Sequence, residues 1–172
     1  MGETSELKAY APGAKAMRIG PAPHIAIDYA GAGPLVVFLH GIGGDRAAWT
    51  PQIEAFSGHY TTVAWDARGY GDSDDYEGPL RFADMADDLV RVLDAFAVRQ
   101  AHIVGTSMGG RIALETYAHH PDRFATVTLA GVHAKFGAFS PEKQREFVEV
   151  RRKPLIEDGL EPADIAPRVI GK

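Results

Sequence analysis

Short runs of apolar, mostly β-branched residues recur along the chain and predict strands. Residues 25–29 alternate between apolar and polar positions, as a half-buried strand does. Four further runs are apolar at mostly consecutive positions: Leu35–Leu39, Thr62–Trp65, Ala101–Val104 and Val127–Ala130. Consecutive apolar positions are typical of strands that are covered on both faces, as in a parallel sheet. Residues 1–24 are rich in Ala, Pro and Gly, and we expect them to form an N-terminal arm or edge segment.

Helical patterns alternate with these strands. Apolar residues spaced by three and four, such as Phe82, Met85, Leu89 and Phe96, predict one amphipathic helix. Near the end of the chain, Ser140 can cap a helix over residues 141–153, and Pro154 is expected to end it. Strands that alternate with amphipathic helices favour an α/β fold with a mostly parallel, doubly wound sheet.

Length and composition limit the domain organisation. The 172 residues can bury one core, which we place in residues 25–137. After Gly137 the sequence becomes polar and helical, so residues 138–172 form a separate segment. The arginines of this segment, Arg145, Arg151 and Arg152, could attract a carboxylate, but a solvated helix face is the favoured interpretation. Four large apolar residues are assigned to the core: Trp49, Phe56, Trp65 and Phe124.

The charge and the residue types argue against several function classes. A net charge of −5 with scattered basic residues offers no face for nucleic acid. The apolar runs are far shorter than the ~20 residues that cross a bilayer, so we expect no membrane partner and a cytoplasmic location. The chain has no cysteine, and its seven histidines show no metal-ligand spacing, so no metal and no cofactor are expected.

A serine motif follows one of the predicted strands. Gly105-Thr106-Ser107-Met108-Gly109 lies between the strand 101–104 and a helical run that starts near Arg111. A serine at such a sharp turn has strained backbone angles, and Gly105 and Gly109 remove the Cβ clashes that the turn would create. Ser107 is therefore a candidate nucleophile.

A second glycine-rich turn follows the strand 35–39. In His40-Gly41-Ile42-Gly43-Gly44, Gly41 and Gly43 can free backbone N–H groups to face a ligand. The amides of Ile42 and Met108 are the candidate donors of an oxyanion hole. A third turn, Trp65–Ser73, is polar and glycine-rich, and a structural role is favoured for it.

Taken in this order, the three elements resemble those of the α/β-hydrolase superfamily over about residues 25–135. Phe38-Leu39-His40-Gly41, the stretch Trp65–Ser73 and the stretch Gly105–Ala113 are most similar to the 3-oxoadipate enol-lactonase-like and small esterase branches. The resemblance implies the first six strands of that fold, with Ser107 at the nucleophile elbow and residues 138–172 as the start of a helical lid. It implies hydrolysis of a small carboxylic ester or (enol-)lactone through an acyl-enzyme. Because the nucleophile position holds serine, the resemblance argues against the haloalkane dehalogenase and epoxide hydrolase branches, which place aspartate there.

The acid and base of a catalytic triad are not identified. The family order is Ser, then Asp or Glu, then His, and only His119, His120 and His133 follow Ser107. His119 and His120 lie about eleven residues along the helix, or about 16 Å away. His133 follows a strand and is a weak candidate base, because neither Glu115 nor Asp122 could orient it. The chain alone is therefore expected to be inactive.

Three explanations for the missing triad residues stay open. The chain is a truncated or degraded piece, one half of a split enzyme whose second chain or C-terminal fragment completes the fold, or a natural short form. In this chain alone the strand 126–130 would be left as an open sheet edge, which the missing part of the sheet would cover. Two other functions are compatible with the motifs: a carbon–carbon bond hydrolase of the same fold, and a non-catalytic binding module.

Overall fold

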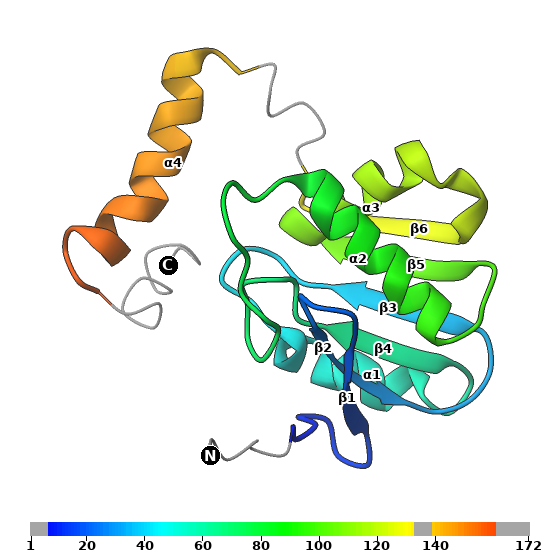
Figure 1. Ribbon diagram of the computed structural model, residues 1–172. Coiled ribbons are helices and arrows are strands. Elements are labelled where there is room, and N and C mark those ends of the chain that lie inside the picture. The colour runs from blue at the N-terminus through cyan, green and yellow to red at the C-terminus, as the bar shows by residue number, and fades with distance from the viewer. Residues whose placement is uncertain (1–6, 133–138, 161–172) are drawn as a thin grey trace. The chain divides into compact units, whose positions relative to one another are not determined.

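The computed structural model describes residues 7–132 and 139–160, in two compact units that divide after Val132 (Figure 1). The first unit contains six strands: β1 (Lys15–Ile19), β2 (Ile25–Ala30), β3 (Leu35–Leu39), β4 (Thr61–Trp65), β5 (Ala101–Thr106) and β6 (Phe124–Ala130). Its helices are α1 (Thr50–Phe56), α2 (Phe82–Ala95) and α3 (Met108–His119), with short 3-10 turns η1 (Arg46–Trp49) and η2 (Pro121–Arg123). The second unit contains α4 (Pro141–Ile156).

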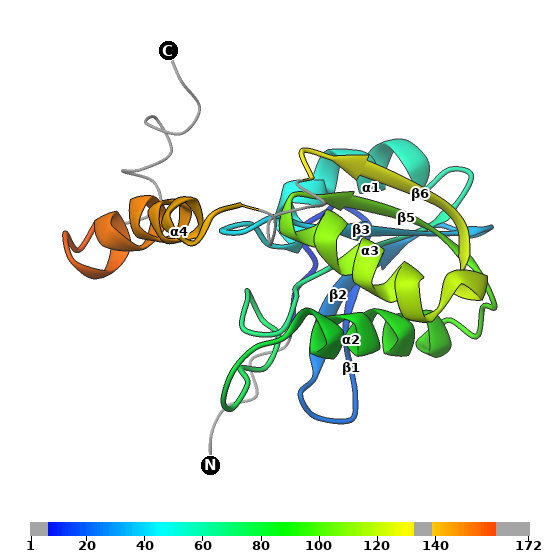
Figure 2. The same ribbon diagram turned by 90° about the horizontal axis from the view of Figure 1, so that it is seen from above.

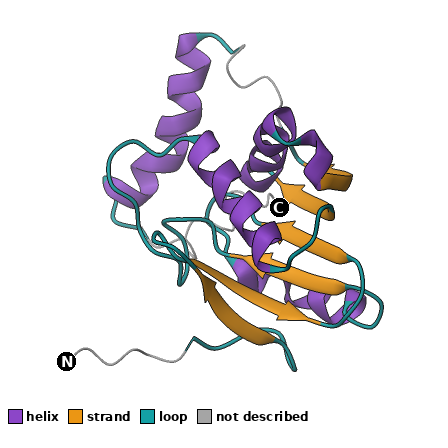
Figure 3. Cartoon of the chain, turned by 45° about the vertical axis from the view of Figure 1, so that its right-hand side comes forward, coloured by secondary structure: helices purple, strands orange, loops and turns teal. Residues whose placement is uncertain are grey.

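The six strands form one sheet in the order β1-β2-β4-β3-β5-β6. Figure 3 shows the strands of this sheet in orange. β1 pairs antiparallel with β2, and β2 pairs antiparallel with β4. The remaining four strands are parallel, with Val37 of β3 opposite Val63 of β4 and Ile103 of β5. The mostly parallel α/β sheet predicted from the sequence is confirmed.

Helices cover both faces of the sheet (Figure 2). α2 and α3 lie on one face, where Val37 and Ile103 pack with Leu89 and Ile112 in the larger core cluster. On the other face lies α1, whose Ile53 belongs to a smaller cluster with Val36, Phe38 and Ala64. Successive residues of β3 thus enter different clusters, which explains why its apolar positions are consecutive.

Strand β6 is the exposed edge of the sheet. Within residues 7–132 it pairs only with β5, and all of its residues after Phe124 are exposed, including Val127 and Leu129 at about 40%. The open edge predicted for residues 126–130 is confirmed.

Several details differ from the sequence-based predictions. Within residues 1–24, expected to be an arm or edge segment, the regular strand β1 forms at one edge of the sheet and pairs with β2, although its apolar pattern is weak. Phe56 is 44% exposed, because it is the last residue of the short helix α1. Helix α4 continues past Lys153 and includes Pro154. A proline so close to the helix end removes one backbone donor without breaking a long hydrogen-bond ladder.

Candidate active site

Ser107 stands at the turn between β5 and α3. Its backbone angles are φ 49° and ψ −109°, a region that residues with a side chain rarely adopt. A Cβ on Gly105 would lie 2.6 Å from the carbonyl of Gly109, and one on Gly109 would lie 2.2 Å from the carbonyl oxygen of Leu39. The turn is therefore possible only with glycine at these two positions, and it leaves Ser107 exposed.

Backbone hydrogen bonds hold the serine in this turn. The N–H of Ser107 donates to the carbonyl of Ala130 at the end of β6 over 2.9 Å, and the Ser107 carbonyl accepts from the N–H of Arg111 over 3.1 Å. The Ser107 amide is thus engaged, whereas Met108 is the first residue of α3. The amides of a first helical turn lack partners within the helix and carry partial positive charge.

The glycine-rich loop after β3 lies against this turn. A Cβ on Gly41 would approach the Cβ of Ser107 to 3.3 Å. The Gly44 N–H closes the loop on the Gly41 carbonyl over 3.1 Å, and Gly43 has a φ of 76°. Ile42 lies at the tip of this loop, and its side chain is 60% exposed and so lies outside the core. The two segments that carry the candidate oxyanion amides, the glycine-rich loop with Ile42 and the start of α3 at Met108, therefore both lie next to Ser107.

The third turn, Trp65–Ser73, holds a buried ion cluster, which confirms its structural role. Arg46 and Asp66 are fully buried; the Arg46 guanidinium donates to Asp28 over 2.8 Å, to Asp72 over 2.7 Å, and to Asp66. Burial alone would lower the pKa of Arg46, but the hydrogen bonds that Arg46 donates to Asp72 and Asp28 and the charge of Asp66 raise it. The cluster fixes the loop after β4 to the turn η1.

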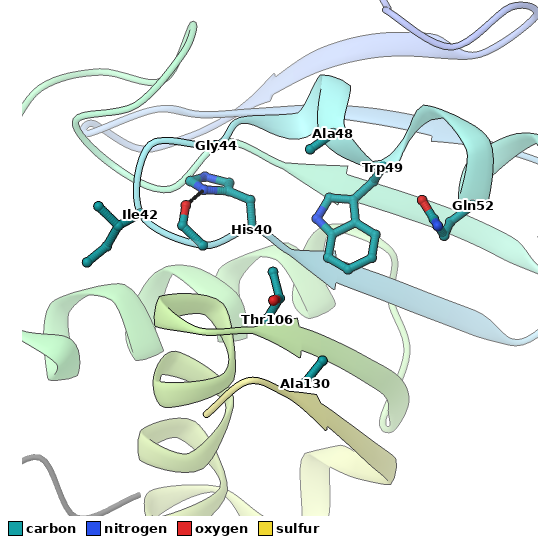
Figure 4. Close-up of a pocket in the computed structure, with 9 residues that line it drawn as sticks. His40, Ile42, Gly44, Ala48, Trp49, Gln52, Thr106 and Ala130 are labelled. Atoms are coloured by element: carbon teal, nitrogen blue, oxygen red, sulfur yellow. Dashed lines mark hydrogen bonds between the residues drawn. The ribbon is translucent and has the colours of Figure 1, made fainter. Parts of the chain in front are cut away.

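A pocket of about 290 Å³ opens beside the glycine-rich loop (Figure 4). Trp49, assigned to the core from the sequence, stacks on Phe38 at 5.1 Å between ring centres and also lines this pocket. The other lining residues come from the loop, from η1 and α1, and from the ends of β5 and β6: His40, Gly41, Ile42, Gly44, Ala48, Gln52, Thr106 and Ala130. The pocket is mostly apolar, and its lining includes Gly41, which lies against the Ser107 side chain, and Thr106, which precedes Ser107 in the chain.

The base for Ser107 is not found in the part of the chain that the structure describes. The ring nitrogens of His40 are both engaged with backbone atoms, of Gly41 and of Ala67. His119 ends α3 and pairs with Glu115, far along the helix from Ser107. His133 lies outside the described residues. Within residues 7–132 and 139–160, no group of three or more His, Cys, Asp or Glu side chains is arranged to hold a metal ion.

Comparison with known proteins identifies the family. A family model described as the alpha/beta hydrolase fold matches residues 34–152, more than half of the chain. The chain belongs to the α/β-hydrolase family. Among its relatives, 3-oxoadipate enol-lactonase 2 of Acinetobacter baylyi is 31% identical over 145 residues, which are 82% of this chain and 52% of the relative. A protein of Azorhizobium caulinodans named "Putative carbamate hydrolase RutD" is 35% identical over 76% of this chain and 48% of its own length.

Solved structures of α/β-hydrolases agree with this assignment. A thermophilic esterase from Thermogutta terrifontis matches with a TM-score of 0.72 and 27% identity, over 83% of this chain and 54% of the esterase. The chain thus spans about half the length of the curated relatives it matches. No helix in the described ranges is long and apolar enough to cross a membrane.

Proposed function

We propose that this α/β-hydrolase chain carries the nucleophile and oxyanion hole of a serine hydrolase that acts on a small carboxylic ester or (enol-)lactone. The observation that carries the proposal is the strained turn at Ser107, packed against the glycine-rich loop through Gly41. Backbone strain at a single exposed serine is unfavourable for stability, and such strain clusters at functional sites. The relative named as an enol-lactonase supports the substrate class.

In the proposed reaction, Ser107 Oγ attacks the carbonyl carbon of the substrate while a base removes the hydroxyl proton. The carbonyl oxygen becomes an oxyanion that accepts hydrogen bonds from the amides of Ile42 and Met108. The bond to the alkoxy group then breaks, and the proton passes to the leaving oxygen. Water repeats the sequence on the acyl-enzyme and releases the acid. Each oxyanion donor of this kind contributes about 10²- to 10³-fold to the rate.

The base and acid are proposed to come from a second chain or a C-terminal fragment. His40 is buried, and both of its ring nitrogens are engaged with backbone groups, so it cannot accept the proton of Ser107. His119 lies too far along α3 to act on the same group. The described part of this chain alone is therefore expected to hydrolyse no substrate.

A fluorophosphonate and denatured mass spectrometry test the proposal. We expect an adduct on Ser107 when the completing segment is present, and none on the Ser107→Ala variant under the same conditions. An adduct on another residue, or a Ser107 that is unreactive in every form of the protein, contradicts the nucleophile assignment and favours a binding module.

A substrate panel separates the remaining activities. An enol-lactone, a simple ester and a carbamate all pass through an acyl transfer to Ser107, and the last is included because one relative carries a carbamate hydrolase name. A dienoate ring-cleavage product tests the carbon–carbon bond hydrolase alternative. Turnover of the dienoate alone would overturn the ester or lactone assignment.

A further inference from the structure

The ring of His40 connects two loops of the site from a buried position. His40 is only 1% exposed. Its Nδ1 lies 2.8 Å from the carbonyl oxygen of Gly41, and its Nε2 lies 3.0 Å from the backbone nitrogen of Ala67. A carbonyl only accepts hydrogen bonds and a backbone amide only donates. The two contacts therefore require a neutral ring with its proton on Nδ1.

Tyr70 extends this connection to the serine turn. Its ring meets the His40 ring edge-on, with 5.0 Å between the ring centres. The Tyr70 hydroxyl donates to the Sδ atom of Met108 over 3.5 Å. His40 and Tyr70 together thus join the loop after β3, the loop after β4 and the start of α3.

We propose that neutral His40 is a positioning residue for the oxyanion hole. Its ring holds the Gly41 carbonyl next to the loop after β4 through the bond to Ala67. Tyr70, in that loop, contacts the Met108 side chain. The candidate donor amides of Ile42 and Met108 are thereby held at a fixed distance and orientation to each other. The proposal rests on the proposed function, because it assumes that these two amides receive the oxyanion.

Protonation of His40 is incompatible with this arrangement. A second ring proton on Nε2 would face the N–H of Ala67, and the hydrogen bond between them would be lost. The charged groups that act on the ring are Asp45 at the start of η1 and Asp66 after β4, and Asp66 is itself paired with Arg46. Burial lowers the pKa of His40 more than its bond to Gly41 and these two carboxylates raise it.

Nuclear magnetic resonance on the purified chain tests the proposal without any reaction. Ring nitrogen spectra, assigned with the His40→Gln variant, are expected to show Nδ1 protonated and Nε2 unprotonated. On acidification, the backbone amide signals of Ile42 and Met108 are expected to shift with the midpoint of the His40 ring. Circular dichroism on the same samples checks that the chain stays folded.

Variants separate positioning from a general effect on the fold. Gln in place of His40 can offer its amide oxygen to Ala67, so His40→Gln is expected to keep the neutral-state amide signals of Ile42 and Met108 and to abolish their titration. His59→Gln changes an exposed histidine and is expected to leave the titration unchanged. Tyr70→Phe keeps the ring contact and removes the hydroxyl, so it is expected to shift the Met108 amide while Ile42 stays in place.

The outcomes distinguish this proposal from the proposed function. A ring protonated on Nε2, or Ile42 and Met108 amides that do not respond to the His40 titration, would overturn the positioning role even if Ser107 reacts with the fluorophosphonate. Conversely, a chain with the expected ring and amide behaviour whose Ser107 never reacts would overturn the proposed function alone.

Discussion

Replacing Ser107 with glycine is expected to make the chain more stable than replacing it with alanine. Neither variant has the hydroxyl, so the comparison isolates the cost of a Cβ at φ 49° and ψ −109°. Such backbone strain is worth about 1–3 kcal/mol. Glycine also makes the unfolded chain more flexible than alanine does, which lowers the stability of the glycine variant by about 0.5–1 kcal/mol. The free energy of unfolding of Ser107→Gly is therefore expected to exceed that of Ser107→Ala by about 1 kcal/mol.

Urea unfolding followed by circular dichroism measures the difference, which corresponds to about 2–4 °C in Tm for a domain of this size. Two alanines serve as controls. Ala97 also has a positive φ, of 52°, so Ala97→Gly is expected to stabilise the chain. Ala55 lies exposed in α1 with ordinary helical geometry, so Ala55→Gly is expected to destabilise it by about 0.5–1 kcal/mol. If Ser107→Gly were no more stable than Ser107→Ala, the turn would not be strained and the argument for a functional serine would lose its basis.

Three further predictions concern the packing and the charges. Gly109→Ala is expected to lower the free energy of unfolding, measured in urea, by about 3 kcal/mol, because the new Cβ would meet the Leu39 carbonyl. Gly58 has open space around it, so the control variant Gly58→Ala is expected to change the free energy of unfolding by less than about 0.5 kcal/mol. Arg46→Met is expected to cost about 3–5 kcal/mol, since it leaves buried Asp28 and Asp66 without their cation; a loss below about 1 kcal/mol would contradict that reading of the cluster. The pKa of His40 is lower in the folded chain than in the unfolded chain, so the unfolded chain binds a proton there more readily. The contribution of neutral His40 to the free energy of unfolding is therefore full above pH 6.5 and falls as the pH drops towards the lowered folded pKa. Urea midpoints between pH 5 and pH 7.5 are expected to show a smaller drop for His40→Gln than for the unsubstituted chain.

The parallel strands and the serine turn could be predicted because their signals are local. The consecutive apolar residues of β3 and the glycines around Ser107 each reflect a constraint that acts within a few positions. The closeness of the glycine-rich loop after β3 to the serine turn after β5 followed from the sheet, because loops at the carboxyl ends of neighbouring parallel strands meet at one edge.

Features that depend on distant partners were not predictable from the pattern. The partners of Arg46, Asp28 and Asp66, lie 18 and 20 residues away, and no periodicity relates them. The hydrogen bond from the Ala67 amide to His40 Nε2 likewise depends on a loop that is 27 residues away. Strand β1 likewise owes its form to pairing with β2 rather than to its own sequence.

The bond from the Ser107 amide to the Ala130 carbonyl makes the nucleophile turn dependent on the edge strand. Ala130 is the last residue of β6, a strand with a single pairing neighbour in the described first unit. Strand ends of this kind open locally at a lower free energy than central strands. Each opening of the β6 end would release the Ser107 amide to solvent. Hydrogen exchange at Ser107 therefore reports how firmly the edge of the sheet is held, and any molecule that pairs with β6 would slow that exchange.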